Sequence, residues 1–177
     1  MDVKIHEAIE FATLKHAKQK RKGTEIPYIV HPMEVMQILT ENGCAEDLII
    51  AGILHDTLED TDTKPEEIKE KFGENVLRLV LGESEDKSKS WEERKQATVD
   101  HLAACPRDEA VCCLADKLSN LRSIYSDRKK IGEKVWERFR REKSKIEWYY
   151  ASIAKATERL SDTKIWKDYT ALLEETF

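Results

Sequence analysis

Glycine and proline are scarce in this sequence, with only 6 glycines and 4 prolines among 177 residues. Both residue types interrupt helices and form turns, so a low content of them favours long helices. Segments that alternate between apolar and polar residues, as half-buried strands do, are also missing. The sequence therefore predicts an all-α fold.

Cysteines are few, and they lack the spacing of a metal site. The chain contains 4 of them, namely Cys44, Cys105, Cys112 and Cys113. They do not form the paired cysteine motifs of structural zinc sites, and a disulfide between the two adjacent ones would be awkward. We read all four as reduced thiols of a cytoplasmic protein.

A signal peptide and a membrane-length apolar run are missing too. Residues 1–4 do not begin an apolar core, and no apolar run approaches the ~20 residues that cross a bilayer. The net charge is −5, with 35 acidic and 30 basic residues interspersed, so no general nucleic-acid surface is expected. We expect one domain over residues 1–177, large enough to bury roughly 70% of its unfolded surface.

What the chain does contain is an apolar segment that ends in a group of polar residues. Residues 48–54 are apolar at nearly every position, which predicts a helix buried on all sides. The polar residues that follow are His55, Asp56, Glu59 and Asp60. Buried carboxylates are costly unless a positive charge neutralises them, as a bound metal ion does. A polar helix end without a ligand is the alternative reading of this segment alone.

Two further potential ligands, His31 and Asp116, lie in apolar segments elsewhere in the chain. With His55 and Asp56 they offer two imidazoles and two carboxylates from three separate segments. This donor set suits Mn²⁺, Fe²⁺, Co²⁺ or Zn²⁺ better than Ca²⁺, and the lack of a thiolate argues against a structural zinc site. His101 is interpreted instead as a packing or solvent-facing residue.

The order of these residues resembles the HD-domain phosphohydrolases, and further motifs resemble the RelA/SpoT-type alarmone hydrolases among them. The motifs are Arg21-Lys22-Gly23-Thr24, Tyr28-Ile29-Val30-His31-Pro32, His55-Asp56-Thr57 with Glu59-Asp60-Thr61, Glu85-Asp86-Lys87, and Ala115-Asp116-Lys117-Leu118-Ser119-Asn120. The match extends from about Ile5 to Leu160, nearly the whole chain. The resemblance implies an HD-domain helical bundle that binds Mn²⁺ through His31, His55, Asp56 and Asp116.

The resemblance also implies roles for other residues. Similar enzymes use the pair Glu59 and Asp60 to take a proton from the attacking water and to orient it. The implied substrate contacts are Arg21, Lys22, Lys87, Asn120, Lys145 and Tyr149. In this set Lys22 would face a phosphate and Arg21 the base. Lys145 and Tyr149, four residues apart on one helix face, would close the pocket.

The chain departs from the family pattern in two places. Residues 83–87 read Glu-Ser-Glu-Asp-Lys where Val-Thr-Asp-Asp-Lys is usual. The family often has arginine where Lys145 stands, and Arg138, Arg140 and Arg141 lie nearby in this sequence.

Helix boundaries are predicted from capping residues and from helix-breaking residues. Thr63 with Glu66 predicts a capping box at the start of one helix, and Gly82 predicts the end of the next. Two amphipathic helices are predicted at the end of the chain, over residues 142–160 and 163–175.

From the resemblance we expect a small stand-alone (metazoan SpoT-like) alarmone hydrolase. It would be a Mn²⁺-dependent 3′-pyrophosphohydrolase that converts guanosine 3′,5′-bis(diphosphate) (ppGpp) or its pentaphosphate (pppGpp), the alarmones of the stringent response, to GDP or GTP. The partner expected is this small-molecule nucleotide, with no nucleic acid and no membrane. The expected compartment is the cytoplasm.

Two other functions stay open on the sequence alone. One is a different HD phosphohydrolase, acting on another nucleotide or on the 2′-phosphate of NADPH. The other is a non-catalytic nucleotide-binding module. The complete ligand set and the intact pair Glu59 and Asp60 argue against the module, because a sensor need not keep both.

Overall fold

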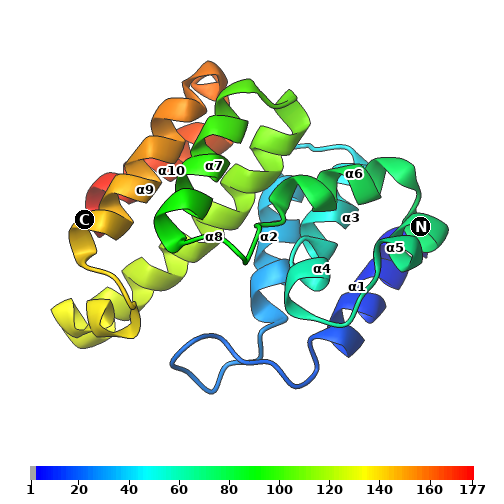
Figure 1. Ribbon diagram of the computed structural model, residues 1–177, viewed down its shortest axis with the longest axis horizontal. Coiled ribbons are helices and arrows are strands. Elements are labelled where there is room, and N and C mark those ends of the chain that lie inside the picture. The colour runs from blue at the N-terminus through cyan, green and yellow to red at the C-terminus, as the bar shows by residue number, and fades with distance from the viewer. Residues whose placement is uncertain (1–2) are drawn as a thin grey trace.

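The protein is built from helices over residues 3–177, the part that the structure describes (Figure 1). This structure is a computed structural model, and residues 1 and 2 of the predicted domain lie outside the described part. The α-helices are α1 (Val3–Lys15), α2 (Val30–Glu41), α3 (Glu46–Leu54), α4 (Thr57–Asp60), α5 (Pro65–Phe72), α6 (Glu74–Glu83), α7 (Trp91–Ala104), α8 (Arg107–Ile131), α9 (Lys143–Ala156) and α10 (Lys164–Thr176). Two short 3₁₀ helices are η1 (Gly132–Arg138) and η2 (Glu158–Leu160).

The described residues form no β-strand, and a single isolated antiparallel β-bridge joins Lys20 to Pro27. The all-α prediction is therefore confirmed. None of the described helices is both long enough and apolar enough to span a bilayer. Helix α1 and the C-terminus lie toward opposite ends of the long axis (Figure 1).

Helix α3 is surrounded by other helices because it is apolar on nearly every side. Residues 48–54 are all buried, and α1, α2, α6 and α8 pack against this helix. At Gly52, a Cβ atom would overlap the Leu39 side chain of α2 and lie 3.1 Å from Val35 Cγ1. The absence of a side chain lets α2 and α3 pack closely, which brings the start of α2 next to the end of α3.

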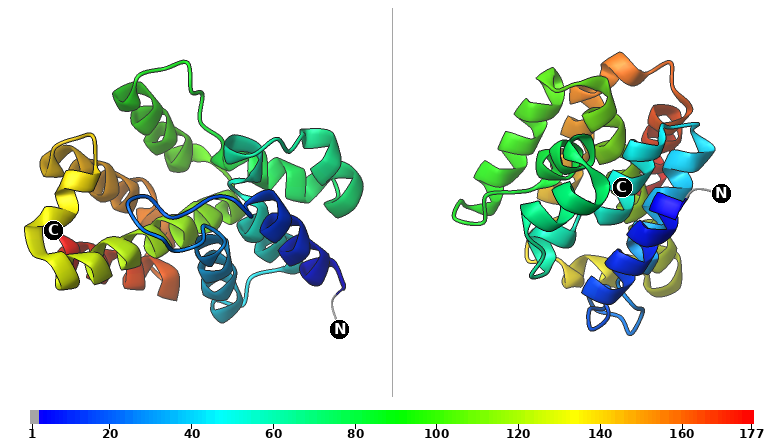
Figure 2. Two further views of the ribbon diagram at one scale, coloured as in Figure 1. Left: turned by 90° about the horizontal axis from the view of Figure 1, so that it is seen from below. Right: turned by 90° about the vertical axis from the view of Figure 1, so that its right-hand side faces the viewer.

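Helix α8 has 25 residues and runs across the molecule, packing against α2, α3, α6 and α10 (Figures 1 and 2). Its buried side carries Leu114, Leu118 and Leu121, which three- and four-residue spacings keep on one face. Asp116 and Ser119 are buried on the same helix. The packing of α8 therefore places polar side chains against α2 and α3.

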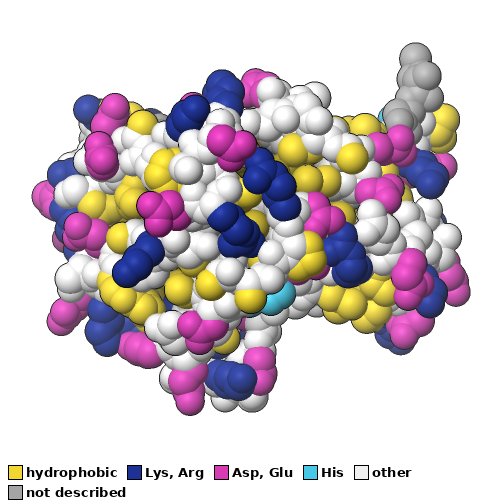
Figure 3. All heavy atoms as spheres, turned by 90° about the horizontal axis from the view of Figure 1, so that it is seen from above, with side chains coloured by type: hydrophobic (Ala, Val, Ile, Leu, Met, Phe, Trp, Pro, Cys, Tyr) yellow, Lys and Arg dark blue, Asp and Glu magenta, His cyan; other side chains and the backbone are white. Residues whose placement is uncertain are grey.

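The last helices cover the other side of α8. Helix α10 packs against α8, and α9 packs against α7. The buried hydroxyl of Tyr169 on α10 donates to the carbonyl oxygen of Tyr150 on α9 at 2.8 Å, which joins these two helices. On the face seen from above in Figure 3, acidic and basic side chains are interspersed.

The loop between α1 and α2 is held by backbone hydrogen bonds. The N–H of Arg21 donates to the carbonyl oxygen of Ile26 at 2.8 Å. Gly23 has a φ of 72°, a conformation that favours glycine, and it forms the turn. These features fix the backbone that carries Arg21 and Lys22.

The predicted capping box at the start of α5 is wrong by one residue. Glu67, rather than Glu66, accepts a hydrogen bond from the backbone N–H of Lys64 at 2.8 Å. The reason is that the hydroxyl of Thr63 lies 2.7 Å from that of Thr61 and is engaged there.

The predicted end of α6 at Gly82 is also wrong, because the helix continues to Glu83. Gly82 packs against the long helix α8, where a Cβ atom would lie 3.2 Å from Glu109 Oε2. This glycine allows a close contact between two helices and does not end one of them.

The predicted helix over residues 142–160 ends earlier than expected, at Ala156. The hydroxyl of Thr157 donates to the carbonyl oxygen of Ile153 at 2.7 Å, and a 3₁₀ turn follows. The last helix lies where it was predicted, with the Thr163 hydroxyl accepting from the N–H of Trp166.

Candidate active site

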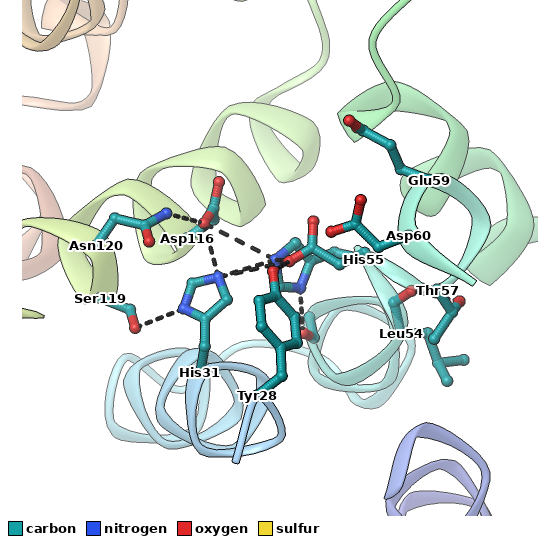
Figure 4. A network of polar contacts seen from close by, with 12 residues as sticks. Tyr28, His31, Leu54, His55, Thr57, Glu59, Asp60, Asp116, Ser119 and Asn120 are labelled. Atoms are coloured by element: carbon teal, nitrogen blue, oxygen red, sulfur yellow. Dashed lines mark hydrogen bonds and ion pairs between the residues drawn. The ribbon is translucent and has the colours of Figure 1, made fainter. Parts of the chain in front are cut away.

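Three helix segments bring three potential metal ligands to one point in the interior (Figure 4). His31 lies in the first turn of α2, His55 at the end of α3, and Asp116 in the middle of α8. Their ligand atoms all lie within 4.8 Å of one another. The histidines are 2% exposed and Asp116 is 6% exposed, so the ligands are shielded from bulk water.

The rings of His31 and His55 present their Nε2 atoms to each other, 3.2 Å apart. Asp116 Oδ1 lies 3.0 Å from His31 Nε2 and 3.8 Å from His55 Nε2. Asp56 Oδ2 lies 2.9 Å from His55 Nε2 and 3.6 Å from His31 Nε2. The structure thus brings all four predicted ligands together, and we call these four residues the central cluster.

The Nδ1 atom of each histidine is engaged away from the centre of this cluster. His55 Nδ1 lies 2.8 Å from the carbonyl oxygen of Gly52, and His31 Nδ1 lies 2.8 Å from Ser119 Oγ. A carbonyl oxygen can only accept, so Nδ1 of His55 carries a proton, and when the ring loses its second proton to bind an ion the lone pair is at Nε2. Two inward-facing imidazole nitrogens flanked by carboxylate oxygens are a donor set for a divalent transition metal. The central cluster therefore fits such an ion.

The charges of the central cluster follow from burial and from the facing groups. Burial lowers the pKa of His55, but the carboxylates of Asp56 and Asp116 more than offset it and raise this pKa to about 10. Burial keeps the pKa of His31 below its ordinary value. Burial would raise the pKa of Asp56, but the His55 imidazole opposite holds it below the usual range. For Asp116, burial is offset by Lys117 and then by the imidazoles, which hold its pKa low. Both carboxylates are therefore charged at neutral pH, as metal ligands must be.

Tyr28 contacts the central cluster, a role that was not predicted from the sequence. Its hydroxyl donates to Asp56 Oδ2 at 2.5 Å. Burial and then the charge of Asp56 raise the pKa of Tyr28, so the hydroxyl keeps its proton and stays a donor. The available signal was its position three residues before His31, within the same motif.

Asn120 connects the central cluster to the predicted substrate residues. Its Nδ2 donates to Asp116 Oδ1 at 2.6 Å, and its Oδ1 accepts from Arg21 Nη2 at 2.9 Å. The Arg21 guanidinium lies 5.7 Å from the ring centroid of Tyr28, a distance typical of a cation–π contact. Arg21 and Asn120 therefore lie directly beside the cluster.

Two cavities adjoin Asn120. The smaller, of about 200 Å³, is lined by Arg21, Lys22, Tyr28 and Phe139 among others. The larger, of about 620 Å³, shares Lys22, Asn120 and Phe139 with it. Six cations line the larger cavity, namely Lys22, Arg94, Lys95, Lys117, Arg140 and Arg141. Among the described residues, no carboxylate lines it, so it suits a ligand with several negative charges.

Glu59 and Asp60 lie on the short helix α4, which directly follows Asp56. In Figure 4 the Asp60 carboxylate points toward the central cluster, and the Glu59 carboxylate lies farther from it. Lys87 Nζ lies 3.5 Å from Glu59 Oε1 and 3.3 Å from Asp60 Oδ1. Burial raises the pKa of Glu59, although Lys87 acts in the opposite direction. The structure thus places the Lys87 ammonium group in contact with both predicted catalytic acids.

The two predicted substrate residues of α9 have different surroundings. Tyr149 is buried and lines the larger cavity, and its hydroxyl has no hydrogen-bond partner among the described residues. Lys145 Nζ instead pairs with Glu92 Oε1 at 2.8 Å and is not among the residues lining this cavity. Arg141 Nε lies 3.5 Å from the same Glu92 oxygen, and Arg141 does line the cavity.

Comparison with known proteins agrees with this geometry. A family model described as "HD domain" matches residues 8–156. The guanosine-3′,5′-bis(diphosphate) 3′-pyrophosphohydrolase of Aquifex aeolicus is 44% identical over 140 residues, which are 75% of this chain and 20% of that protein. The chain therefore spans about a fifth of the length of that relative. The enzyme of the same name from Danio rerio is 44% identical over 121 residues, which are 67% of each protein.

Two solved structures resemble this one over most of its length. A crystal structure of a Listeria monocytogenes protein has a TM-score of 0.77 at 33% identity, covering 81% of this chain and 96% of that one. The structure of a metazoan ortholog of SpoT, described as hydrolysing ppGpp and as having a role in starvation responses, has a TM-score of 0.81 at 28% identity. That match covers 99% of this chain and 96% of the other.

Proposed function

The chain belongs to the HD domain family, and from this premise we propose that it hydrolyses ppGpp and pppGpp at the 3′ position, releasing pyrophosphate and GDP or GTP. The observation that carries the proposal is a buried metal-ligand cluster beside a cavity lined by six cations. A metal-dependent phosphohydrolase needs both parts, ligands for an ion and a place for several phosphates. Relatives that match this chain carry the same activity in their names.

We propose that the metal is Mn²⁺ and that His31, His55, Asp56 and Asp116 hold it. When bound, such an ion supplies Lewis acidity, which polarises a phosphoryl oxygen and makes a water molecule more acidic. The chain contributes a donor set held by its surroundings. Both outer histidine nitrogens are hydrogen-bonded, and Tyr28 holds Asp56 through its hydroxyl. These ligands therefore need little rearrangement to bind an ion.

We propose that Glu59 and Asp60 accept the proton of the attacking water and orient it. Burial raises the pKa of Glu59, which makes its carboxylate a stronger base than that of an exposed glutamate. Lys87 contacts both carboxylates, and its ammonium group is a candidate contact for the distal phosphate. The two acids and the lysine would then act together on the side of α4.

We propose that Arg21 and Lys22 bind the nucleotide, with Arg21 toward the base and Lys22 toward a phosphate. Asn120 would contact the sugar, since it lies between Asp116 and Arg21. The Tyr149 hydroxyl would donate a hydrogen bond to the substrate in the larger cavity. Lys145, paired with Glu92, would act only at the rim of the pocket.

We propose further that residues 1–177 form one domain that works in the cytoplasm. Buried apolar residues from Ala8 to Tyr169 belong to one hydrophobic core, which supports a single domain. The four cysteines are all free in the structure, as reduced thiols would be.

Product analysis after incubation with Mn²⁺ tests this function. The substrates are ppGpp, pppGpp, a panel of guanine and adenine 5′-nucleotides, and NADPH, and a chelated sample is the control. We expect pyrophosphate with GDP or GTP, and no products without metal. Phosphate release from NADPH without cleavage of ppGpp would identify a different HD phosphohydrolase. Nucleotide binding without any turnover would identify a binding module, and either result overturns the proposal.

A further inference from the structure

A series of hydrogen-bonded side chains reaches His31 from outside the central cluster. Arg122 Nη1 donates to Glu34 Oε1 at 3.3 Å. Ser119 Oγ donates to Glu34 Oε2 at 2.8 Å, and His31 Nδ1 lies 2.8 Å from Ser119 Oγ. Glu34 follows His31 by three residues on α2, and Ser119 follows Asp116 by three residues on α8. The two helices that carry these ligands therefore also carry the series.

The direction of each hydrogen bond follows from the groups involved. A carboxylate only accepts, so the single hydroxyl proton of Ser119 points to Glu34. The oxygen of Ser119 must then accept from Nδ1–H of His31. In a neutral imidazole one nitrogen is the donor and the other the acceptor, so the lone pair of His31 lies at Nε2. This nitrogen is the one that faces His55 in the central cluster.

We infer that Ser119 is a positioning residue that fixes the tautomer of His31 for metal binding, and that Glu34 fixes the direction of the Ser119 hydroxyl. Arg122 acts one step farther out, where its charge balances that of Glu34. Ser119 is 1% exposed, so its hydroxyl is separated from bulk water that could otherwise take the place of Glu34. Outer partners of metal-bound histidines commonly set the tautomer and the ring orientation in this way.

The two imidazoles of the cluster are therefore oriented by different means. His55 Nδ1 donates to the main-chain oxygen of Gly52, a group that every residue type would supply at this position. His31 depends on side chains, and a hydroxyl can turn to donate or to accept. Of the two histidines, His31 is thus the one whose orientation can be altered by a side-chain substitution at a residue that is not itself a ligand.

The inference rests on the proposed metal site, so its test measures metal binding. In Ser119→Ala we expect the affinity for Mn²⁺, measured by calorimetry on metal-stripped protein, to fall by about 10- to 100-fold. Glu34→Ala should act in the same direction but less strongly, because the Ser119 hydroxyl can still turn to accept from His31. Ser126→Ala, at an exposed serine of the same helix, is the matched control and should bind Mn²⁺ like the parent.

A second measurement separates positioning from a merely structural role. Long-range ¹H–¹⁵N spectra of the metal-free protein report which nitrogen of His31 carries the proton. We expect Nδ1 in the parent and a mixture of tautomers in Ser119→Ala, with His55 unchanged. An unaltered Mn²⁺ affinity in Ser119→Ala, or a proton on Nε2 of His31 in the parent, overturns the inference and leaves ppGpp hydrolysis intact. A parent that binds no Mn²⁺ overturns the proposed metal site, and this inference with it.

Discussion

Two histidine-containing clusters in this protein each bring three potential metal ligands within a few ångströms of one another, yet their surroundings differ. In the central cluster, the ligand atoms of both histidines and of Asp116 lie within 4.8 Å of one another. The same limit holds for His101, Cys105 and Glu109, which we call the outer cluster. Distance alone does not separate the two.

Guanidinium groups contact two of the three potential ligands of the outer cluster, Glu109 and Cys105. Arg78 Nη1 pairs with Glu109 Oε1, and Arg159 Nη2 lies 3.6 Å from Cys105 Sγ. His101 Nε2 lies 3.0 Å from the other Glu109 oxygen, and its side chain is 46% exposed. Burial raises the pKa of Cys105, which keeps its sulfur a thiol, whereas a metal binds the thiolate.

In the central cluster both imidazole Nε2 atoms face inward, and the carboxylate oxygens beside them accept hydrogen bonds from the neutral groups of Asn120 and Tyr28. The outer nitrogens of the histidines contact neutral groups, and the ammonium of Lys117 pairs with Oδ2 of Asp116, while Oδ1 faces His31. The contrast indicates that inward-facing donors held mainly by neutral groups fit a metal ion better than donors already paired with guanidinium groups.

Loss of a central carboxylate should have the largest effect. We expect Asp116→Ala and Asp56→Ala each to reduce Mn²⁺ from about one ion per chain to near zero and to abolish turnover, because metal binding needs charged ligands. Elemental analysis after dialysis measures the metal, and assays of the same samples measure activity. Full metal occupancy in both variants would remove the proposed site.

Glu59→Gln should separate proton transfer from metal binding. We expect kcat to fall by about 10²- to 10⁴-fold while Mn²⁺ content stays unchanged, because only the basic carboxylate is lost. The base works when deprotonated, so kcat of the parent should fall as the pH drops through the pKa of Glu59, which burial raises. The variant should lack this acid limb, and Glu66→Gln, at an exposed acid of α5, is the control. A retained kcat would assign the proton step to Asp60 or to the metal alone.

Lys22→Ala should weaken substrate binding and leave the metal in place. A hydrogen bond to a charged group contributes about 1.5–3 kcal/mol, so we expect KM for ppGpp to rise by about 10- to 100-fold. Lys18→Ala removes an exposed cation just before the same loop and should leave KM unchanged. An unaltered KM in Lys22→Ala for every nucleotide tested would mean that Lys22 is an ordinary solvated side chain.

The two neighbouring cations that share Glu92 should differ in their effects. Arg141 lines the larger cavity, so Arg141→Ala should raise KM by about 5- to 10-fold. Lys145 pairs with Glu92 near the surface, so Lys145→Ala should change KM by less than about threefold. Steady-state kinetics on the two variants side by side decide between them. A larger effect at Lys145 would restore it as the cation that closes the pocket.

The outer cluster should give no effect on metal content. We expect His101→Ala and Cys105→Ser to retain the Mn²⁺ content and kcat of the parent, because Arg78 and Arg159 already supply positive charge there. Titration of Asp116→Ala with Zn²⁺ is a sharper test, since the central cluster is then disabled. Saturable Zn²⁺ binding that disappears on adding Cys105→Ser would show that the proximity of the potential ligands is enough to bind a metal ion.

The helical fold and the residues that meet in the central cluster could be predicted because both follow from patterns along the chain. The apolar run over residues 48–54 predicted a buried helix, and all of these residues are buried in α3. The ligands lie in recognisable motifs at the ends or on the faces of predicted helices. The end of α6 could not be predicted from such patterns. The helix continues through Gly82, which packs closely against Glu109 on another helix.

By itself, the sequence determined the all-α fold, the buried helix α3 and the identities of the candidate ligands, since periodicity and motif order are properties of neighbouring residues. The packing of α2, α3 and α8 sets which atoms of those candidate ligands face inward. The tertiary structure also decided that Ser119 and Glu34 hold His31, and that guanidinium groups occupy the outer cluster. These contacts join residues far apart in the chain. Which of them meet depends on how the helices pack, and no local pattern of residues encodes that.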